Sequence, residues 1–336
     1  MQVKLLPSAP TQKKKECDTM TDNNEFLLFD RLQKIQQIIS KNGEENFSIS
    51  YSGGLDSNVL SALIDMALPE NKIPRVYCDT GIELSAVRDF VKAKCEQDSR
   101  FEIIKPTVPI KKMLETDGYP FKSKFHSMMV ARYYRYGRDN KTIRKYLKIL
   151  SEGEPEHKWY GKTTCPKCLE YQFKENNMPF KISDKCCDRL KKEPLKQWQR
   201  ENGKVYAIIG ITLDEGGQRA SAKCLAFSGK KLKAFQPLVP VTKEWEHWLI
   251  DTYNISLPIV YYPPYNFART GCKGCPFAIG LQHELDVLQE YFPNERKQCE
   301  AIWKPVYDEY RRLGYRLRKD DGQMNFFDYE IQVKGR

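Results

Sequence analysis

The sequence predicts an α/β fold in which a parallel sheet is covered by helices on both faces. Short runs typical of strands occur at residues 47–51, 75–80 and 101–105. These runs alternate with segments whose apolar residues recur every three or four positions, the spacing of one helix face. Strands that alternate with helices usually pair in parallel, because each helix carries the chain back over the sheet.

The remaining elements follow the same rules of spacing. The helices expected are 24–41, 55–68, 84–95, 244–253 and two within 284–314 that are broken near Pro293, and one further strand is expected at 205–212. In sheets of this kind, ligands bind beyond the carboxyl ends of the strands. Functional residues are therefore expected directly after the strands.

Composition narrows the class of protein. The chain has 336 residues, of which 40% are hydrophobic, so it can bury a sizeable core. It contains no run of 18 apolar residues, which excludes a predicted membrane span, and its polar start lacks the apolar centre of a secretory signal. We therefore expect a cytoplasmic protein. The net charge of +11 indicates an anionic partner, or a lysine-rich solvated surface.

We expect a division into a flexible tail over 1–24, an α/β domain over 25–270, a Cys-x-x-Cys motif with C-terminal helices over 271–318, and a tail over 319–336. Inside the α/β domain, residues 118–175 are basic and rich in tyrosine and are expected to be a helical insertion. Such a composition suits nucleic acid, because tyrosines stack on bases and cations contact phosphates. A solvated helix face is the simpler explanation.

A glycine-rich loop joins the first strand to the helix after it, and reads Ser52-Gly53-Gly54-Leu55-Asp56-Ser57. Backbone N–H groups at the start of a helix attract phosphate, and the two glycines let phosphate approach closely. The two serines add hydroxyl donors, and Asp56 can hold a metal on the phosphates or orient the loop. The loop has no lysine and is not of the Walker type. The alternative is an ordinary strand–helix turn.

Four of the eleven cysteines form two compact motifs: Cys186 and Cys187 are adjacent, and Cys272 and Cys275 form a Cys-x-x-Cys turn. In a reducing compartment such motifs indicate ligands rather than disulfides. Adjacent side chains point apart and chelate one Zn²⁺ poorly, so a [4Fe-4S] cluster suits the set better than zinc.

Other cysteines leave alternatives open. Cys165 and Cys168 form a second Cys-x-x-Cys, which would bind zinc with other ligands or take the place of Cys186. Cys224 lies between the two main motifs and would replace one of the adjacent pair. Small core residues are the interpretation for Cys78, Cys95 and Cys299.

These segments carry a family resemblance. The loop at residues 52–57 resembles the PP-loop of ATP pyrophosphatases. Three further segments resemble the phosphoadenosine phosphosulfate (PAPS) reductase family of that superfamily: residues 77–81 match its Asp-Thr-Gly motif, 186–195 its Cys-Cys and Lys-x-x-Pro-Leu motif, and 271–275 its late Cys-x-x-Cys. The matches span roughly residues 47 to 280, which is most of the chain.

The resemblance implies a PP-loop α/β fold that binds ATP or a related adenine nucleotide with Mg²⁺. Arg219 matches a family arginine that contacts the nucleotide phosphates. The implied nucleotide-binding residues are Ser52, Gly53, Gly54, Asp56, Ser57, Asp79, Thr80 and Gly81, the implied catalytic residues are Asp56, Ser57 and Arg219, and the implied ligands of a [4Fe-4S] cluster are Cys186, Cys187, Cys272 and Cys275.

One departure from the family bears on the reaction. Sulfonucleotide reductases attack sulfur with a cysteine in a mobile C-terminal tail, but this chain has no cysteine after Cys299. We therefore expect cleavage of ATP to AMP and pyrophosphate, which activates an acceptor such as DNA or tRNA for sulfur transfer. The alternatives are a sulfonucleotide reductase that uses another cysteine, and a nucleotide-binding or nucleic-acid-binding module without turnover.

The C-terminal tail suggests a further partner. Residues 323–327 read Gln-Met-Asn-Phe-Phe and resemble the pentapeptide that docks on bacterial sliding clamps. Adjacent aromatic residues on a polar tail are costly in water unless they are covered. The simpler interpretation is that they pack against the protein's own surface.

Overall fold

The computed structural model describes residues 12–149, 164–174, 178–214, 222–228 and 231–319. The chain forms two compact units, each assembled from separate segments. The first unit comprises 1–77, 97–102 and 199–257, and the second comprises 78–96, 103–198 and 258–336. The basic segment 118–175 and the C-terminal helices over 271–318 therefore belong to the same unit.

A six-stranded sheet confirms the predicted α/β class. Its strand order is β3-β2-β1-β4-β6-β5. β1 pairs in parallel with β2 on one side and with β4 on the other. The order therefore reverses between β1 and β4, the kind of position beside which α/β sheets bind ligands. The strands are β1 (Phe47–Tyr51), β2 (Arg75–Cys78), β3 (Phe101–Ile104), β4 (Tyr206–Ile208), β5 (Leu225–Ser228) and β6 (Lys231–Phe235).

The sheet includes two strands that the sequence analysis did not predict. β6 pairs in parallel with β4, whereas β5 pairs with β6 antiparallel, with Leu225 opposite Phe235. β4 is also shorter than the predicted 205–212. β4 ends at Ile208, although the Ile209 N–H still donates to the Phe235 carbonyl at 3.0 Å.

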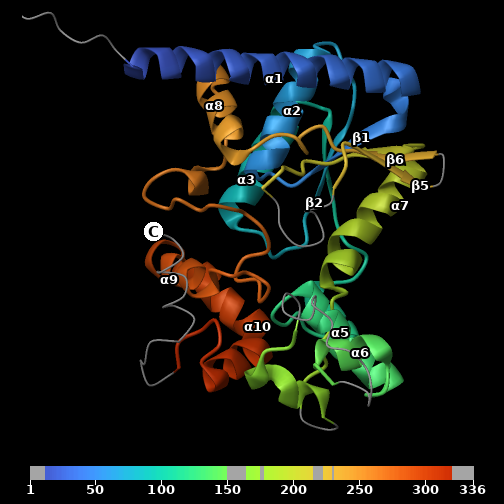
Figure 1. Cartoon of the computed structure of the whole chain (residues 1–336), viewed down its shortest axis with the longest axis vertical. Coiled ribbons are helices and arrows are strands. Elements are labelled where there is room, and N and C mark those ends of the chain that lie inside the picture. Colours follow the sequence, from blue (N-terminus) through green and yellow to red (C-terminus); the bar gives the residue numbers. More distant parts are fainter. Residues whose placement is uncertain (1–11, 150–163, 175–177, 215–221, 229–230, 320–336) are drawn as a thin grey trace, which may run out of the picture. The chain divides into compact units, whose positions relative to one another are not determined.

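Three helices of the first unit stack beside the sheet: α1 (Gln12–Asn42), α2 (Leu55–Ala67) and α8 (Lys243–Tyr253), as Figure 1 shows. α1 packs on α2, and α2 packs on both α8 and β1. Residues 12–24 are helical and not the predicted tail. Lysine, glutamate and methionine favour helix, and no glycine or proline interrupts residues 12–42. None of the described helices is both long and apolar enough to cross a membrane.

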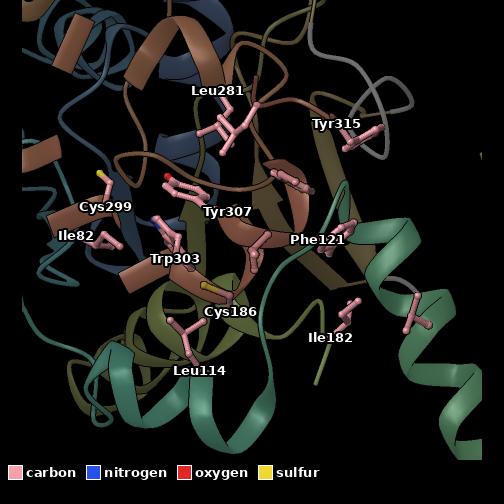
Figure 2. Packing of buried hydrophobic residues seen from close by; sticks show 14 of the residues in the cluster. Ile82, Leu114, Phe121, Ile182, Cys186, Leu281, Cys299, Trp303, Tyr307 and Tyr315 are labelled. Atoms are coloured by element: carbon pink, nitrogen blue, oxygen red, sulfur yellow. The ribbon is translucent and has the colours of Figure 1, made fainter. Parts of the chain in front are cut away.

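The second unit is mainly helical. Its helices are α3 (Ser85–Gln97), α4 (Ile110–Asp117), α5 (Lys124–Tyr136), α6 (Lys141–Tyr146), most of α7 (Glu193–Glu201), α9 (Leu281–Tyr291) and α10 (Pro293–Leu313). The break predicted near Pro293 is confirmed, with proline at the first position of α10, where its missing N–H costs nothing. The core of this unit gathers around α10, whose Trp303, Tyr307 and Tyr310 are fully buried. Figure 2 shows Trp303 and Tyr307 in this core, together with Cys186 and Cys299.

Candidate functional site

The Ser52–Ser57 loop lies between the end of β1 and the start of α2. Gly53 has φ 71°, a left-handed conformation that favours glycine. Ser52 Oγ accepts a hydrogen bond from the Gly54 N–H at 3.3 Å and donates to Ser57 Oγ at 3.1 Å. Ser57 Oγ in turn donates to the Gly54 carbonyl at 2.9 Å. The serines therefore shape the loop from within, and α2 directs the N–H groups of its first turn toward the end of β1.

Asn58 supports this loop from the buried side, a role that the sequence analysis missed. Its Nδ2 donates to the carbonyls of Gly53 at 3.1 Å and Gly54 at 2.9 Å. Its Oδ1 accepts from Tyr51 Oη at 2.7 Å. Both side chains are buried, so the loop conformation is set before any ligand arrives. The residue that follows the six-residue motif thus helps to hold it.

Lys243 and Glu246 join Asp56 beside the loop. The ammonium group of Lys243 contacts Asp56 Oδ1 and lies 2.7 Å from Glu246 Oε2. The Glu246 side chain is fully buried, whereas those of Asp56 and Lys243 are 24% and 33% exposed. Burial and the nearby Asp56 raise the pKa of Glu246 to about 8. Nothing in the sequence pointed to Lys243, because 187 residues separate it from Asp56.

Gly210 brings the end of β4 against the same loop. A Cβ atom at this position would lie 3.1 Å from the carbonyl oxygen of Asp56, closer than side chains normally pack. Only glycine therefore allows this approach without displacing the loop. Two residues later, Thr212 is buried and its Oγ1 has no hydrogen-bond partner among the described residues. The loop, β4 and α8 thus meet beside the point where the strand order reverses.

The predicted Asp79-Thr80-Gly81 segment forms a tight turn. Asp79 Oδ1 accepts from the Gly81 N–H at 2.9 Å, and Gly81 has φ 79°. The N–H and the hydroxyl of Thr80 both donate to the buried carboxylate of Glu83. This turn belongs to the second unit, whereas the Ser52–Ser57 loop belongs to the first. That both segments bind one nucleotide stays a prediction.

The four cysteines predicted as ligands lie in one neighbourhood of the second unit. Burial raises the pKa of Cys186, and the nearby thiols of Cys272, Cys187 and Cys275 raise it further. Burial also raises the pKa of Cys272 to about 11. Within the described residues, no three cysteine, histidine or acidic side chains converge closely enough to bind one metal ion. That these four cysteines bind a cluster stays a prediction.

Gly274 lies inside the Cys-x-x-Cys turn, at a position where no other residue fits without strain. Its φ is 58°, and a Cβ atom there would lie 2.3 Å from Tyr307 Oη and 2.8 Å from Cys299 Sγ. Tyr307 Oη donates to the Gly274 carbonyl, and the Gly274 N–H donates to Glu284 Oε1 at 2.8 Å. The helices α9 and α10 therefore fix the backbone of this turn through Glu284 and Tyr307. Figure 2 shows Tyr307 and Cys299 of α10.

The neighbours of Gly274 are held in the same manner. Trp303 Nε1 donates to the Lys273 carbonyl at 3.1 Å, and the Lys273 N–H donates to the Ile82 carbonyl at 2.8 Å. Tyr310 Oη donates to the Pro276 carbonyl at 2.9 Å. Each of these backbone groups lies at or beside the Cys272–Cys275 turn. The aromatic residues of α10 thus position the two thiols as well as fill the core.

The Cys186-Cys187 pair precedes a π-helical turn over 188–192 that runs into α7. Pro194 has no N–H, so it cannot donate the α-helical hydrogen bond to the Leu190 carbonyl four residues before it. The Cys78 thiol donates to this carbonyl instead, at 3.1 Å. π-helical turns often occur at functional sites. Cys78 is buried, in agreement with its interpretation as a small core residue.

Lys191, in the same π-helical turn, connects the cysteines to the Asp79–Gly81 turn. Its ammonium group lies 3.0 Å from Glu83 Oε1, and Glu83 accepts from Thr80. Burial lowers the pKa of Lys191, but the Cys272 thiol and Glu83 outweigh this effect and raise it well above its ordinary value. Lys191 therefore supplies positive charge beside the thiols.

The alternative cysteines lie apart from these contacts. Cys165 and Cys168 lie close to each other and to Lys122 in the second unit, with Cys165 buried and Cys168 exposed. Cys224 belongs to the first unit, where its thiol lies beside Arg31. Arg219 and the Gln323–Phe327 segment lie outside the described residues.

A cavity of about 830 Å³ lies beside the basic helix α5. Tyr134 and Arg135 of α5 line it and are exposed, and Lys181 and Lys185 add positive charge. Its full lining is Asp117, Ala131, Tyr134, Arg135 and residues 178–185. The tyrosines of this segment divide between two roles, because Tyr134 and Tyr136 face solvent whereas Tyr146 is 4% exposed. Part of the segment is therefore core and part is available to a partner.

No family model and no curated protein matches the chain. Solved structures with a similar fold include a phosphoadenylyl-sulfate (PAPS) reductase from Candida auris in complex with phosphate. The two chains are 12% identical, with 75% of this chain and 93% of the reductase covered and a TM-score of 0.39.

Two other solved structures are similar at the same level. One is the U34-tRNA thiolase NcsA from Methanococcus maripaludis with its [4Fe-4S] cluster, which is 16% identical to this chain. The alignment covers 86% of this chain and 80% of the thiolase chain, with a TM-score of 0.35. The other is an NH3-dependent NAD synthetase from Campylobacter jejuni, which is 12% identical to this chain. The alignment covers 84% of this chain and 95% of the synthetase chain, with a TM-score of 0.36. At such low sequence identities and TM-scores, the role of a residue in one of these proteins cannot be assigned to a residue of this chain.

Proposed function

We propose that this protein binds ATP with its phosphates on the Ser52–Ser57 loop and cleaves it to AMP and pyrophosphate, which activates an acceptor for sulfur transfer. The observation that carries the proposal is the position of the loop. It follows β1, beside the reversal of strand order, and Gly210 leaves room for it at the end of β4. The loop offers backbone N–H groups to phosphate, and Asp56 offers a carboxylate to Mg²⁺.

The reaction proposed begins with adenylation. An oxygen of the acceptor attacks the α-phosphorus of ATP, the bond from that phosphorus to the bridging oxygen breaks, and pyrophosphate leaves. A sulfur nucleophile such as hydrosulfide, supplied from outside, then displaces AMP from the acceptor. N–H groups at the start of α2 offset the charge that develops on the phosphates, since they are fixed in place before ATP binds. Asn58 keeps them there through the carbonyls of Gly53 and Gly54.

We propose that Cys186, Cys187, Cys272 and Cys275 hold a [4Fe-4S] cluster. Their common neighbourhood and the burial of Cys186 support this assignment, and so does the positive charge of Lys191, since a cluster bound by four thiolates is anionic. Such a cluster would supply electrons or a sulfur-binding metal centre. Lys191 would offset its charge, and the helices α9 and α10 would hold two of its ligands through the turn at Gly274.

The acceptor that we propose is a nucleic acid, DNA or tRNA. The net charge of +11 supports a polyanionic partner. The cavity beside α5 combines an exposed tyrosine with arginine and lysine side chains, a combination that suits stacked bases and phosphates. A binding assay with single-stranded RNA and DNA at increasing salt tests this part, since binding to phosphates must weaken steeply as salt rises.

Pyrophosphate release from ATP tests the central proposal. Protein purified without oxygen is expected to release pyrophosphate with Mg²⁺ and acceptor present, and Asp56→Ala is expected to abolish release and leave the fold intact. Asp251→Ala, an exposed aspartate on α8, is the matched control. Release of sulfite from a sulfonucleotide would instead establish the reductase reaction, and nucleotide binding without either product would contradict both.

Iron analysis tests the cluster. We expect about four irons per chain, as one cubane requires, and loss of the brown colour in Cys272→Ser. Cys224→Ser is expected to keep both iron and colour, because Cys224 belongs to the first unit. Oxygen-free protein with one zinc per chain and no iron would refute the cluster.

A further inference from the structure

The Ser52–Ser57 loop has no lysine of its own, although phosphate-binding loops of the Walker type carry one. We propose that Lys243, at the start of α8, is the phosphate-binding cation of the nucleotide site, and that Asp56 and Glu246 hold it ready beside the loop. This inference rests on the proposed nucleotide site, and it names a residue that contacts the nucleotide phosphates.

The position of the Lys243 side chain supports this role. Its ammonium group contacts Asp56, the acidic residue of the loop itself, and its side chain is 33% exposed. The flexible four-carbon stem and the exposed ammonium group let Lys243 turn from Asp56 to a phosphate without movement of the helix.

Glu246 gives Lys243 a fixed orientation. It lies one helical turn after Lys243 on α8, and its buried Oε2 accepts from the lysine at 2.7 Å. Its Oε1 is buried and has no hydrogen-bond partner among the described residues. The hydrogen bond from Lys243 to the buried Oε2 limits how far the lysine moves. Lys243 therefore stays close to the loop in the absence of nucleotide.

Two helix starts reinforce the positive charge at this position. α8 begins at Lys243 and is capped by Thr242, whose Oγ1 accepts from the Trp245 N–H at 3.3 Å. α2 begins at Leu55 and packs on α8. The amino end of each helix carries partial positive charge. A phosphate bound on the loop would thus interact with the ammonium group of Lys243 and with the amino ends of α2 and α8.

The backbone at Lys243 is fixed independently of its side chain. The Lys243 N–H donates to Asp214 Oδ2 at 2.7 Å, and the Leu213 N–H donates to the Val241 carbonyl at 2.9 Å. Both bonds tie the start of α8 to the segment that follows β4. Removal of the ammonium group therefore leaves α8 in place, and Lys243→Ala is expected to fold.

Calorimetric titration of the full-length protein with ATP and with adenosine tests the proposal. Loss of one charged hydrogen-bond partner is expected to weaken ATP binding about 10- to 100-fold in Lys243→Ala, because bonds to charged groups are the strongest of their kind. Adenosine, which has no phosphate, is expected to bind as to the wild type. Lys243→Arg, which keeps the charge, is expected to recover part of the ATP affinity.

Lys204→Ala is the matched control, since Lys204 is a partly exposed lysine of the first unit whose ammonium group donates to the Glu45 carbonyl. It is expected to bind ATP as the wild type does. Unchanged ATP affinity in Lys243→Ala overturns the role of Lys243 and leaves the proposed nucleotide site standing. Equal losses for ATP and adenosine also overturn it, because they indicate a damaged site. A wild type that binds no ATP overturns the proposed function together with this inference.

Discussion

The Ser52–Ser57 loop and the Cys272–Cys275 turn are built in opposite ways. The loop is shaped by hydrogen bonds among its own serines and Asn58, and its Asp56 is partly exposed, as is Lys243 of α8, which contacts it. The Cys-x-x-Cys turn is held by buried side chains of distant helices that contact its backbone. A ligand that comes and goes needs an open site, whereas a permanently bound group can be part of the core. Substitutions should therefore impair binding at the loop and folding at the turn.

The largest effect is expected from Gly274→Ala. The new methyl group would collide with Tyr307 and Cys299, and the residue would remain in a left-handed conformation. We expect a loss of about 3 kcal/mol in the free energy of unfolding, from overpacking and backbone strain together. Urea unfolding measures this loss.

Gly271→Ala is the control for this substitution, because a Cβ atom at Gly271 meets nothing within 4 Å. It should unfold at the same urea concentration as the wild type. Equal stability of the two variants would show that the turn is not packed as described, and the contrast with the loop would disappear.

The core of the second unit is also expected to respond to pH through His126. This histidine is fully buried between Tyr146 Oη at 2.8 Å and Gln172 Oε1 at 2.7 Å. Burial lowers its pKa from 6.5 to about 4. Between these values the unfolded chain binds the proton and the folded chain does not, so stability is complete above pH 6.5 and falls toward pH 4.

The full loss from His126 amounts to about 3 kcal/mol, since one pKa unit corresponds to about 1.4 kcal/mol. Urea unfolding across this pH range measures it. His126→Gln should remove most of the slope, whereas His247→Gln, at an exposed position of α8, should retain it. A slope that survives in His126→Gln would assign the acid sensitivity to other groups.

Gly210→Ala should separate binding from folding at the loop. A methyl group 3.1 Å from the Asp56 carbonyl oxygen must displace the loop by a small amount. We expect about a tenfold loss of ATP affinity, equivalent to about 1.4 kcal/mol, with little change in stability. Titration and thermal unfolding of the same sample measure both. Lower stability with unchanged affinity would reverse the assignment of this region as a binding site.

The smallest effect is expected at Cys78. Cys78→Ala removes the donor to the Leu190 carbonyl and should cost about 1 kcal/mol, whereas Cys78→Ser retains a donor and should cost less. Chemical denaturation of the two variants gives the difference. If alanine is the better tolerated residue, the thiol contributes packing rather than a hydrogen bond.

The parts of the molecule that the sequence predicted are those encoded by local patterns. The β1 strand, the α2 helix and the break before Pro293 follow from spacing and from the limits of proline. β5 and β6 were missed because lysines at 223, 230, 231 and 233 interrupt the apolar pattern of this segment. The helical start of α1 was missed because its polar composition resembles a tail, although polar residues such as lysine and glutamate favour helix.

The same distinction applies to the candidate sites. Motifs identify the glycine loop and the cysteine pairs, since their residues are neighbours in the sequence. Lys243 and Glu246 are not identifiable in this way, because only the packing of α8 on α2 brings them to Asp56. The importance of Gly210 and Gly274 is likewise visible only when the atoms facing their missing side chains are known.

The interleaving of the two units has a consequence for synthesis. Three segments of one unit alternate with three of the other, so the chain passes between them five times. The first unit lacks part of its sheet until residues 199–257 have emerged from the ribosome, and the second lacks α9 and α10 until the end. The first unit is therefore complete only after most of the second has been synthesised, although domains usually fold in order from the amino terminus. Incomplete chains would expose unpaired strand edges, and we expect them to depend on chaperones.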